Sequence, residues 1–469
     1  MKRSLFVLIF LFILMMPIRA AAEDGDAQRL DVSLVRQGGG SAAELCDDSY
    51  NSSVEFNAND SLSIKAPEGQ SIGAIYIKWY KVPGLWKLTL SDGTELECGR
   101  NDFLHEYVSI ENGGISECVM NFTSACAICE VYAYSEGNVP KDVQNWKTPC
   151  DKADLLAFST HADDECLFLG GMLATYAAGR NLQCQVVYMT NYWDALIIRE
   201  HEKLDGLWAM GVKNYPIVAS FADEYAMSLE EAERVYDRNA WTDFITAQIR
   251  RFKPQIVVCQ DFNGEYGHGA HMLEAACVKD AVESSMLNEY YPASASQYGT
   301  WDVPKTYFHL YEQNRISLDL RQPISALGGI TAVDAAAAAY LRHVSQQWCW
   351  FYVSDDPNDP KADKINCAEF GLYRTTVGVD TGNDMMENIV PYAEKDRLEE
   401  EARIEEEKRL AEEEKAAKRE RKRREKELAR EEALKKKPDP ISAGGVAALV
   451  IMTLMLAAGV VVYNKGRTK

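Results

Sequence analysis

Two patterns of hydrophobic and polar positions divide the chain into an all-β region followed by a region of alternating strands and helices. Between about residues 40 and 136, short runs rich in β-branched and aromatic residues are separated by turn signals such as Ser91-Asp92-Gly93. This pattern is typical of a β-sandwich. From residues 151 to 392, apolar strands such as 155–158 and 255–260 alternate with helical segments. That alternation predicts an α/β domain with a Rossmann-like, mostly parallel sheet and helices on both faces.

Both ends of the chain carry long apolar runs. Two basic residues, an apolar stretch and small residues at 20–22 predict a secretory signal peptide over 1–22. The uncharged run 441–463 is long enough for a transmembrane helix, and a basic tail follows at 464–469. We therefore expect a single-pass protein of the cell surface, with an extracellular N-terminal part, a cytoplasmic C-terminus and the lipid bilayer as a partner.

The segment 393–437 consists mostly of acidic and basic residues. Its leucines and isoleucine are too sparse for a coiled-coil seam, and Glu and Lys or Arg recur four residues apart. A solvated single helix of roughly 65 Å is predicted as a stalk. A disordered charged linker is the alternative.

Composition narrows the classes of protein. A chain of 469 residues is expected to hold two or more domains. Its net charge of −21 argues against a nucleic-acid binder, which needs a basic patch. The 12 cysteines permit disulfides if the chain is exported, but the sequence does not determine their pairing or the oligomeric state.

Two polar clusters follow two different predicted strands. His161, Asp163 and Asp164 come after the strand 155–158, and His268 and His271 come after the strand 255–260. The carboxyl ends of parallel strands meet at one edge of a sheet, so the clusters are expected to converge. Imidazole and carboxylate are suitable ligands for Zn²⁺ or a similar divalent ion.

These motifs resemble those of the PIG-L/LmbE-like family of zinc-dependent N-deacetylases. The family's A-H-P-D-D-E motif stands here as Thr160–Glu165, and its H-x-x-H motif as His268–His271. Arg199-x-x-Glu202 followed by Met210-Gly211-Val212 is similar to its R-x-x-E…L-G-V helix, and Phe221-Ala222-Asp223 stands where it has F-x-D-G. The resemblance covers about residues 151–310, with Ala162 in place of proline and Gly269-Ala270 in place of Pro-Asp.

The resemblance implies roles for individual residues. His161, Asp164 and His271 would bind one Zn²⁺ per chain, or another divalent metal. Asp163 would be the general base, and His268 a charged partner near the reacting carbonyl. Arg199 and Asp223 would hydrogen-bond the sugar, although an ion pair of Arg199 with Glu202 is the alternative for that arginine.

Tyr266 lies two residues before His268 and is a candidate hydroxyl donor to the same carbonyl oxygen. An aromatic side chain packed in the wall of the cleft is the alternative for this tyrosine. Loss of the carboxylate at position 270 removes a group that could have oriented a histidine, which is expected to lower activity.

Residues 23–145 resemble discoidin-like, coagulation-factor type C domains, many of which bind glycans, and 138–149 is predicted as the linker to the deacetylase domain at 151–392. A glycan-binding module would hold the enzyme to its polymer, and a structural spacer is the alternative.

We expect an extracellular, membrane-anchored, zinc-dependent deacetylase whose partner is an N-acetylated glycan. The alternatives are a metal-dependent amidase acting on another amide and a catalytically inactive glycan-binding surface protein. Retention of Asp163 beside three ligands favours an enzyme, because binding alone does not require a general base.

Overall fold

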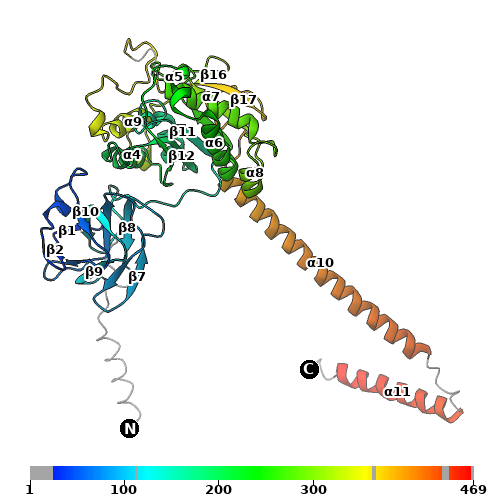
Figure 1. Cartoon of the computed structure of the whole chain (residues 1–469). Helices are drawn as coiled ribbons and strands as arrows, with labels where there is room; N and C mark the ends of the chain where they lie inside the picture. Colours follow the sequence, from blue (N-terminus) through cyan, green and yellow to red (C-terminus); the bar gives the residue numbers. More distant parts are fainter. Residues whose placement is uncertain (1–24, 111–113, 362–365, 436–442, 466–469) are drawn as a thin grey trace, which may run out of the picture. The chain divides into compact units, whose positions relative to one another are not determined.

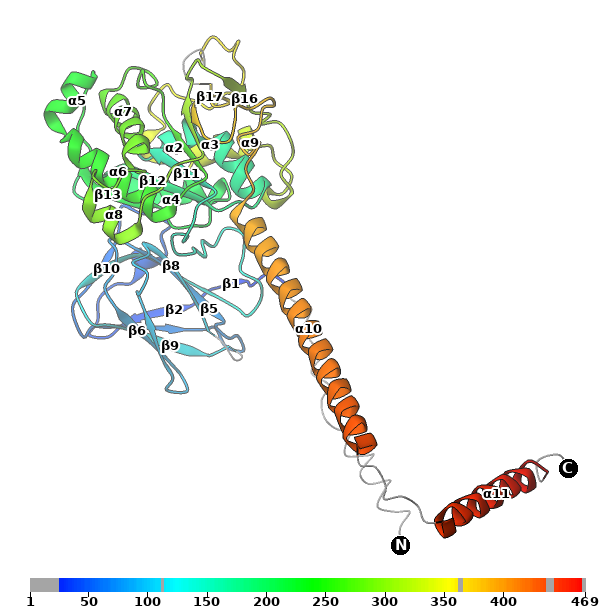
Figure 2. The same cartoon turned by 90° about the vertical axis from the view of Figure 1, so that its right-hand side faces the viewer.

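A computed structural model describes residues 25–110, 114–361, 366–435 and 443–465 (Figures 1 and 2). The chain divides into two compact units, Met1–Tyr392 and Ala393–Lys469. The first unit contains the β-rich and α/β regions. The predicted signal peptide at 1–22 lies outside the described residues.

A seven-stranded sheet forms the centre of the α/β region, in the order β13-β12-β11-β14-β15-β17-β16. The first five strands in this order are parallel to one another, and β17 runs antiparallel to both of its neighbours, β15 and β16. The strands are β11 (Leu155–Ser159), β12 (Cys184–Asn191), β13 (Ile217–Ala222), β14 (Ile256–Cys259), β15 (Lys305–His309), β16 (Arg315–Ser317) and β17 (Glu369–Thr375). The predicted mixed α/β class with a mostly parallel sheet is confirmed.

Helices cover both faces of this sheet (Figure 1). The helices on one face are α2 (Asp164–Leu167), α3 (Gly170–Ala174), α4 (Ile198–Ala209) and α9 (Ala332–Tyr340). Those on the other are α5 (Leu229–Val235), α6 (Arg238–Phe252) and α7 (Gly269–Ser284), with α8 (Pro292–Tyr298) packed against α6. Strand β11 shows why both faces are covered: Leu155 and Ala157 pack on the α4 side, whereas Leu156 and Phe158 pack on the α6 side.

The N-terminal region consists of two antiparallel sheets. One has the order β1-β10-β5-β8, with β3 paired to β10, and the other has the order β2-β4-β9-β6-β7. The strands are β1 (Arg29–Leu30), β2 (Ser33–Arg36), β3 (Val54–Phe56), β4 (Ser61–Lys65), β5 (Ala74–Trp79), β6 (Trp86–Leu90), β7 (Glu95–Cys98), β8 (His105–Ser109), β9 (Glu117–Phe122) and β10 (Cys126–Tyr134). Trp79 and Trp86 are fully buried in the core of this sandwich, with ring centroids 5.6 Å apart.

A buried polar contact joins the sandwich to helix α4. His105 Nε2 in β8 lies 2.9 Å from His201 Nδ1 in α4, and both side chains are fully buried. Burial holds the pKa of each of these two histidines well below the usual range, so both are neutral. The Tyr50 ring stacks on His201 at 4.3 Å, and its hydroxyl donates to Asp205 at 2.7 Å. These contacts fix the sandwich against the helix that begins beside the candidate site.

The segment predicted as a linker is packed against the α/β region. Lys147 N–H donates to the Lys213 carbonyl at 2.9 Å, and Tyr215 N–H donates to the Lys147 carbonyl at 2.9 Å. Trp146 is buried, with its ring centroid 5.2 Å from that of Trp208. Residues 138–149 therefore do not form a free tether.

The second unit contains two helices, α10 (Tyr392–Lys435) and α11 (Ala443–Lys465). Helix α10 carries exposed ion pairs three and four residues apart, such as Arg403 with Glu400 and Glu407. Such pairs stabilise a helix that has no apolar face to bury. The structure thus has a single charged helix over 392–435, not the disordered alternative, and residues 436 and 437 of the predicted stalk lie outside the described residues.

The prediction of a membrane anchor is contradicted. Crossing a hydrocarbon core takes about 20 consecutive apolar residues in one helix. No helix in the described part of the chain is both long enough and apolar enough for this. The predicted transmembrane segment at 441–463 and the bilayer partner are therefore not supported, and the predicted cell-surface location is wrong. Residues 441, 442 and 466–469, which include most of the predicted cytoplasmic tail at 464–469, lie outside the described residues.

All 12 cysteines lie among the described residues, and each of them is a free thiol. Most are buried, and burial raises the pKa of thiols such as Cys98, Cys118 and Cys367 to about 12. These cysteines act as small apolar core residues. The disulfides that the sequence permits are not formed.

Candidate active site

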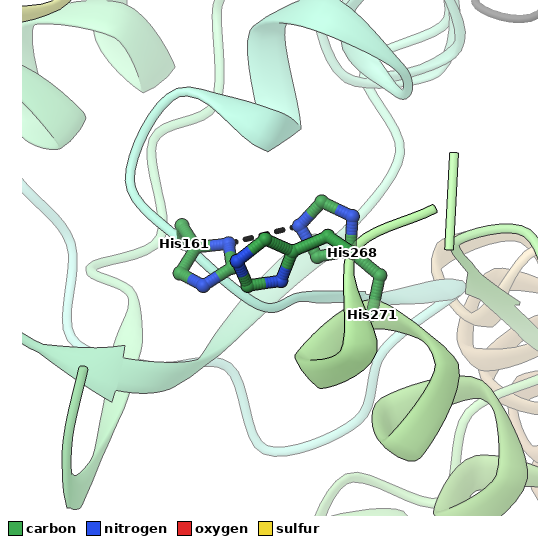
Figure 3. Close-up of side chains that lie close together, drawn as sticks. All are labelled: His161, His268 and His271. Carbon is green, nitrogen blue, oxygen red and sulfur yellow. Dashed lines mark hydrogen bonds between the residues drawn. The ribbon is translucent and has the colours of Figure 1, made fainter. Parts of the chain in front are cut away.

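The two polar clusters meet at the carboxyl edge of the sheet. His161, Asp163 and Asp164 occupy the turn between β11 and α2, and His268 and His271 occupy the first turn of α7, which follows β14. Because β11 and β14 are adjacent parallel strands, their loops emerge side by side. Figure 3 shows the three imidazole rings gathered at this point.

Three side-chain atoms form a tight triangle at the centre of the site. His161 Nδ1 lies 2.9 Å from His271 Nε2 (dashed line in Figure 3) and 3.0 Å from Asp164 Oδ2. Asp164 Oδ2 also lies 3.0 Å from His271 Nε2. All three side chains are almost fully buried. Burial raises the pKa of Asp164, but the two histidines lower it by more, so this carboxylate is ionised.

The outward hydrogen bonds of the two histidines determine which nitrogen carries the proton. His271 Nδ1 lies 3.2 Å from the Gly264 carbonyl, which can only accept, so Nδ1 carries the proton. His161 Nε2 lies 3.2 Å from the carboxylate of Asp223, so Nε2 carries the proton of that ring. Burial lowers the pKa of His161, but Asp164 and Asp223 raise it by more, to about 10, so a cation that binds here would displace a proton from that ring. His161 Nδ1 and His271 Nε2 would then offer their lone pairs to the cation.

Such an arrangement fits a divalent cation. A divalent cation in place of that proton would contact all three ligand atoms, and two imidazoles with one carboxylate suit Zn²⁺. His268 is also close enough to be considered as a ligand in place of Asp164. We favour Asp164, because its Oδ2 lies 3.0 Å from both His161 Nδ1 and His271 Nε2.

Asp163 is adjacent to these three side chains and is held in an unusual conformation. Its φ angle is +116°, a value that non-glycine residues rarely adopt and that clusters at functional sites. Its N–H donates to Glu165 Oε2 at 2.8 Å, and Arg199 Nη2 donates to its Oδ1 at 2.9 Å. Burial raises the pKa of Asp163 to about 6 against the opposing effect of Arg199. A carboxylate with this pKa is suited to accept a proton near neutral pH.

Arg199 and Asp223 both contact site residues in this structure. Arg199 pairs with Asp163 and also donates to the Ala162 carbonyl, while Glu202 bonds to Ser345 instead. The proposed ion pair between Arg199 and Glu202 is therefore absent among the described contacts. Asp223 bonds to His161 and is about a quarter exposed, so it can orient a ligand as well as reach a substrate.

His268 and Tyr266 lie beside the triangle. Burial lowers the pKa of His268 to about 3, and the neighbouring His161 and His271 lower it too, so His268 is neutral here. The expectation of a charged His268 is therefore not favoured. The Tyr266 ring lies 5.9 Å from that of His268 and 5.5 Å from that of His271. These distances agree with the alternative of an aromatic in the wall of the cleft.

Gly269 explains one departure from the family motif. Its N–H donates to the Ala226 carbonyl at 2.8 Å, and a Cβ at this position would lie 2.2 Å from the Ser228 carbonyl oxygen. Proline has no N–H, and its ring would collide with that oxygen. The loop before α5 therefore packs onto the start of α7 in a way that the proline of the family motif would prevent.

Two buried glutamate–histidine pairs, which were not predicted from the sequence, support the loops that follow β11 and β14. His343 Nε2 lies 2.9 Å from Glu165 Oε1, whose other oxygen accepts the N–H of Asp163. His309 Nδ1 lies 2.8 Å from Glu265 Oε2, whose other oxygen accepts the N–H of Asp261. All seven histidines of the chain are buried. The small number of histidines in the sequence was the available sign that His309 and His343 make specific contacts.

Asp223→Asn should weaken metal binding. The substitution removes the charge that holds the proton on His161 Nε2 and thus keeps Nδ1 free as a ligand. Outer carboxylates of this kind typically contribute 10–100-fold to metal affinity. We expect an increase of that size in the dissociation constant for Zn²⁺, measured by competition with a chromophoric chelator. Asp237→Asn at the start of α6 is the control, since its carboxylate caps a helix; an equal loss in both variants would contradict this role for Asp223.

The geometry defines the class of protein, which has an α/β sheet with a triangle of candidate metal ligands at its carboxyl edge. Residues 156–282 match the family "PIG-L: GlcNAc-PI de-N-acetylase". The chain thus contains a PIG-L family domain over these residues. The resemblance given by the motifs is confirmed for this segment.

Individual relatives are similar over the same part of the chain. The 1D-myo-inositol 2-acetamido-2-deoxy-alpha-D-glucopyranoside deacetylase of Mycobacterium leprae is 29% identical over 185 residues, which are 34% of this chain and 59% of the relative. The match therefore spans less than two thirds of that protein's length.

Solved structures give two further likenesses. The N,N'-diacetylchitobiose deacetylase from Pyrococcus horikoshii has 19% identity and a TM-score of 0.32, covering 42% of this chain and 72% of the other. A family 32 CBM from C. perfringens NanJ, in complex with galactose, has 12% identity and a TM-score of 0.19, covering 23% and 99%. The discoidin-like class of the sandwich stays a prediction.

Proposed function

We propose that this protein is a metal-dependent deacetylase that hydrolyses the N-acetyl group of an N-acetylated amino sugar. The observation that carries the proposal is the convergence of His161 Nδ1, His271 Nε2 and Asp164 Oδ2, with the carboxylate of Asp163 next to it. The similarity of residues 156–282 to deacetylases of N-acetylglucosamine conjugates supports the same reaction.

Each residue of the site has a part in the proposed mechanism. His161, Asp164 and His271 hold the metal, and a bound Zn²⁺ supplies the Lewis acid that makes water a nucleophile near neutral pH. Asp163 accepts a proton from the attacking water. As the C–N bond of the acetamide breaks, Asp163 returns that proton to the amine nitrogen, so that acetate and a free amine leave.

Arg199 and His268 complete the proposed site. Arg199 bonds to Asp163 Oδ1 and fixes the direction of the carboxylate, leaving Oδ2 free to face the water. Neutral His268 can donate one N–H to the carbonyl oxygen as negative charge develops there. Its Nδ1 is buried and has no hydrogen-bond partner among the described residues, as expected of a group that awaits substrate.

Acetate release tests the proposal directly. The purified chain is treated with a chelator and assayed on N-acetylglucosamine and on its α-linked conjugate with inositol, before and after Zn²⁺ is added back. We expect activity to disappear and return with the metal, and His271→Ala to remain inactive at the same Zn²⁺ concentration. Full activity in the chelated protein or in His271→Ala would overturn the proposal. Amine release from amides other than acetamido sugars would favour the amidase alternative.

A further inference from the structure

Aromatic side chains stand exposed near the candidate site. Tyr225, Trp348 and Trp350 are 75%, 82% and 65% exposed. Single exposed apolar residues are common, but exposed aromatics whose rings connect to a candidate site, as those of Tyr225 and Trp350 do, mark a surface that binds something. Tyr225 precedes α5, whereas Trp348 and Trp350 follow α9, so the two groups come from distant parts of the sequence.

A continuous series of ring contacts connects Trp350 to the triangle. The ring of Trp350 lies 4.4 Å from that of Phe351, which lies 4.7 Å from that of Tyr266. Tyr266 in turn lies 5.5 Å from His271. From a different loop, Tyr225 meets His268 edge to face, with centroids 5.5 Å apart. Ring contacts therefore connect the exposed Trp350 and Tyr225 to two histidines of the candidate site.

Both aromatic segments are fixed in place before any ligand binds. Ser345 is tied to Glu202 by its N–H at 2.7 Å, and the Gln347 side chain donates to the Tyr340 carbonyl at 2.9 Å. On the other side, the Ala226 carbonyl accepts the N–H of Gly269 at 2.8 Å, which anchors the loop of Tyr225 to α7. A preformed surface loses little entropy when it binds a ligand.

The chemistry of this surface suits sugar rings. One face of a pyranose carries only C–H groups and packs flat on an indole or phenol ring, while the hydroxyls at its rim stay in water. Trp and Tyr bury a large apolar area with few rotatable bonds, which makes them frequent binding hot spots. A peptide substrate would instead be held by hydrogen bonds to its backbone, and exposed ring faces do not supply these.

We propose that Trp350 and Tyr225 form stacking subsites for the sugar units that flank the reacting N-acetylated residue. The inference rests on the proposed function and specifies its substrate as an oligosaccharide or polysaccharide chain. The monosaccharide reaches the triangle alone, whereas a longer chain also covers Trp350.

Kinetics with two substrates test the subsites. The probes are N-acetylglucosamine and its β-1,4-linked tetramer, and KM and kcat are measured by acetate release. For Trp350→Ala we expect KM for the tetramer to rise about tenfold, with kcat unchanged, and both constants for the monosaccharide to stay within about twofold. Trp350→Phe should restore most of the affinity, because it keeps an aromatic face. Tyr290→Ala removes an exposed tyrosine outside the series of ring contacts and is the matched control.

Equilibrium binding separates failure of the subsites from failure of the proposed reaction. Calorimetry with the Asp163→Asn chain measures the affinity for both probes without turnover. If the tetramer binds more tightly than the monosaccharide, and Trp350→Ala abolishes this difference, the subsites are supported. This holds even if neither probe releases acetate with the unmodified chain. Equal affinity for monosaccharide and tetramer, or an equal loss for both in Trp350→Ala, overturns the inference.

Discussion

Asp163→Asn should lower acetate release by two to four orders of magnitude while the metal content of the protein stays unchanged. General base catalysis typically contributes 10²–10⁴-fold, and an amide cannot accept the proton. Asparagine is among the residues that best tolerate a positive φ, so the turn at +116° should keep its shape. The amide oxygen can still accept the hydrogen bond from Arg199 Nη2. The loss should therefore appear in kcat.

The neighbouring Asp164→Asn is the comparison. Asp164 Oδ2 lies 3.0 Å from both imidazole nitrogens and accepts the N–H of His161 at 2.8 Å. Removing its charge should weaken the metal site itself, so bound zinc should fall and added Zn²⁺ should restore part of the activity. Metal analysis of the two purified variants decides between the roles. Equal zinc content in both would show that this division between adjacent carboxylates is wrong.

The parts of the site that the sequence predicted are those set by local pattern and strand order. His161 and Asp164 lie in one tight turn, so their closeness follows from three residues of spacing. His271 joins them because β11 and β14 are neighbouring strands. The sequence predicted both clusters at the carboxyl edge of one parallel sheet, and thus a metal site at that edge, but not that these two strands are adjacent.

The rest of the site depends on packing between distant segments. Asp223 reaches His161 only because β13 lies beside β12 at a register that contains an irregularity, and His343 reaches Glu165 only through the docking of α9. Neither the spacing of residues along the chain nor their secondary-structure propensity predicts such contacts between distant segments. The sequence also offered a family pattern for Arg199, but not its bond to Asp163 in place of Glu202.

The segment 138–149 shows a different limit. Its composition resembled a linker, yet Trp146 is buried and Lys147 bonds to the chain on either side of Asn214. A tryptophan inside a supposed tether was the available sign, because burying so large a ring stabilises a fixed arrangement. This difference bears on what the sandwich does, because a sandwich that is packed against the α/β region can support that region as well as bind a polymer.

Removal of residues 25–136 should reduce activity on small and polymeric substrates alike. The deletion removes Tyr50 and His105, so His201 in α4 loses its hydrogen-bond partner, and the carboxylate of Asp205 loses Tyr50 while it keeps the side chain of Gln144. An unpaired buried polar group costs about 1–3 kcal/mol, and apolar surface is exposed as well. Arg199, which holds Asp163, lies in the first turn of the same helix.

We therefore expect a lower melting temperature and a fall of at least about tenfold in acetate release from both N-acetylglucosamine and its tetramer. His201→Ala in the full chain is a milder change than the deletion, and it tests the same contact if the truncated chain does not fold. Since His201 and His105 are both neutral and fully buried, losing either ring leaves a cavity and an unpaired nitrogen. Val35→Ala, at an exposed position of β2, is the control. If only the rate of acetate release from the tetramer falls, the sandwich acts by holding the polymer. If the rates with both substrates fall in parallel, the sandwich supports α4 and, through Arg199, the carboxylate of Asp163.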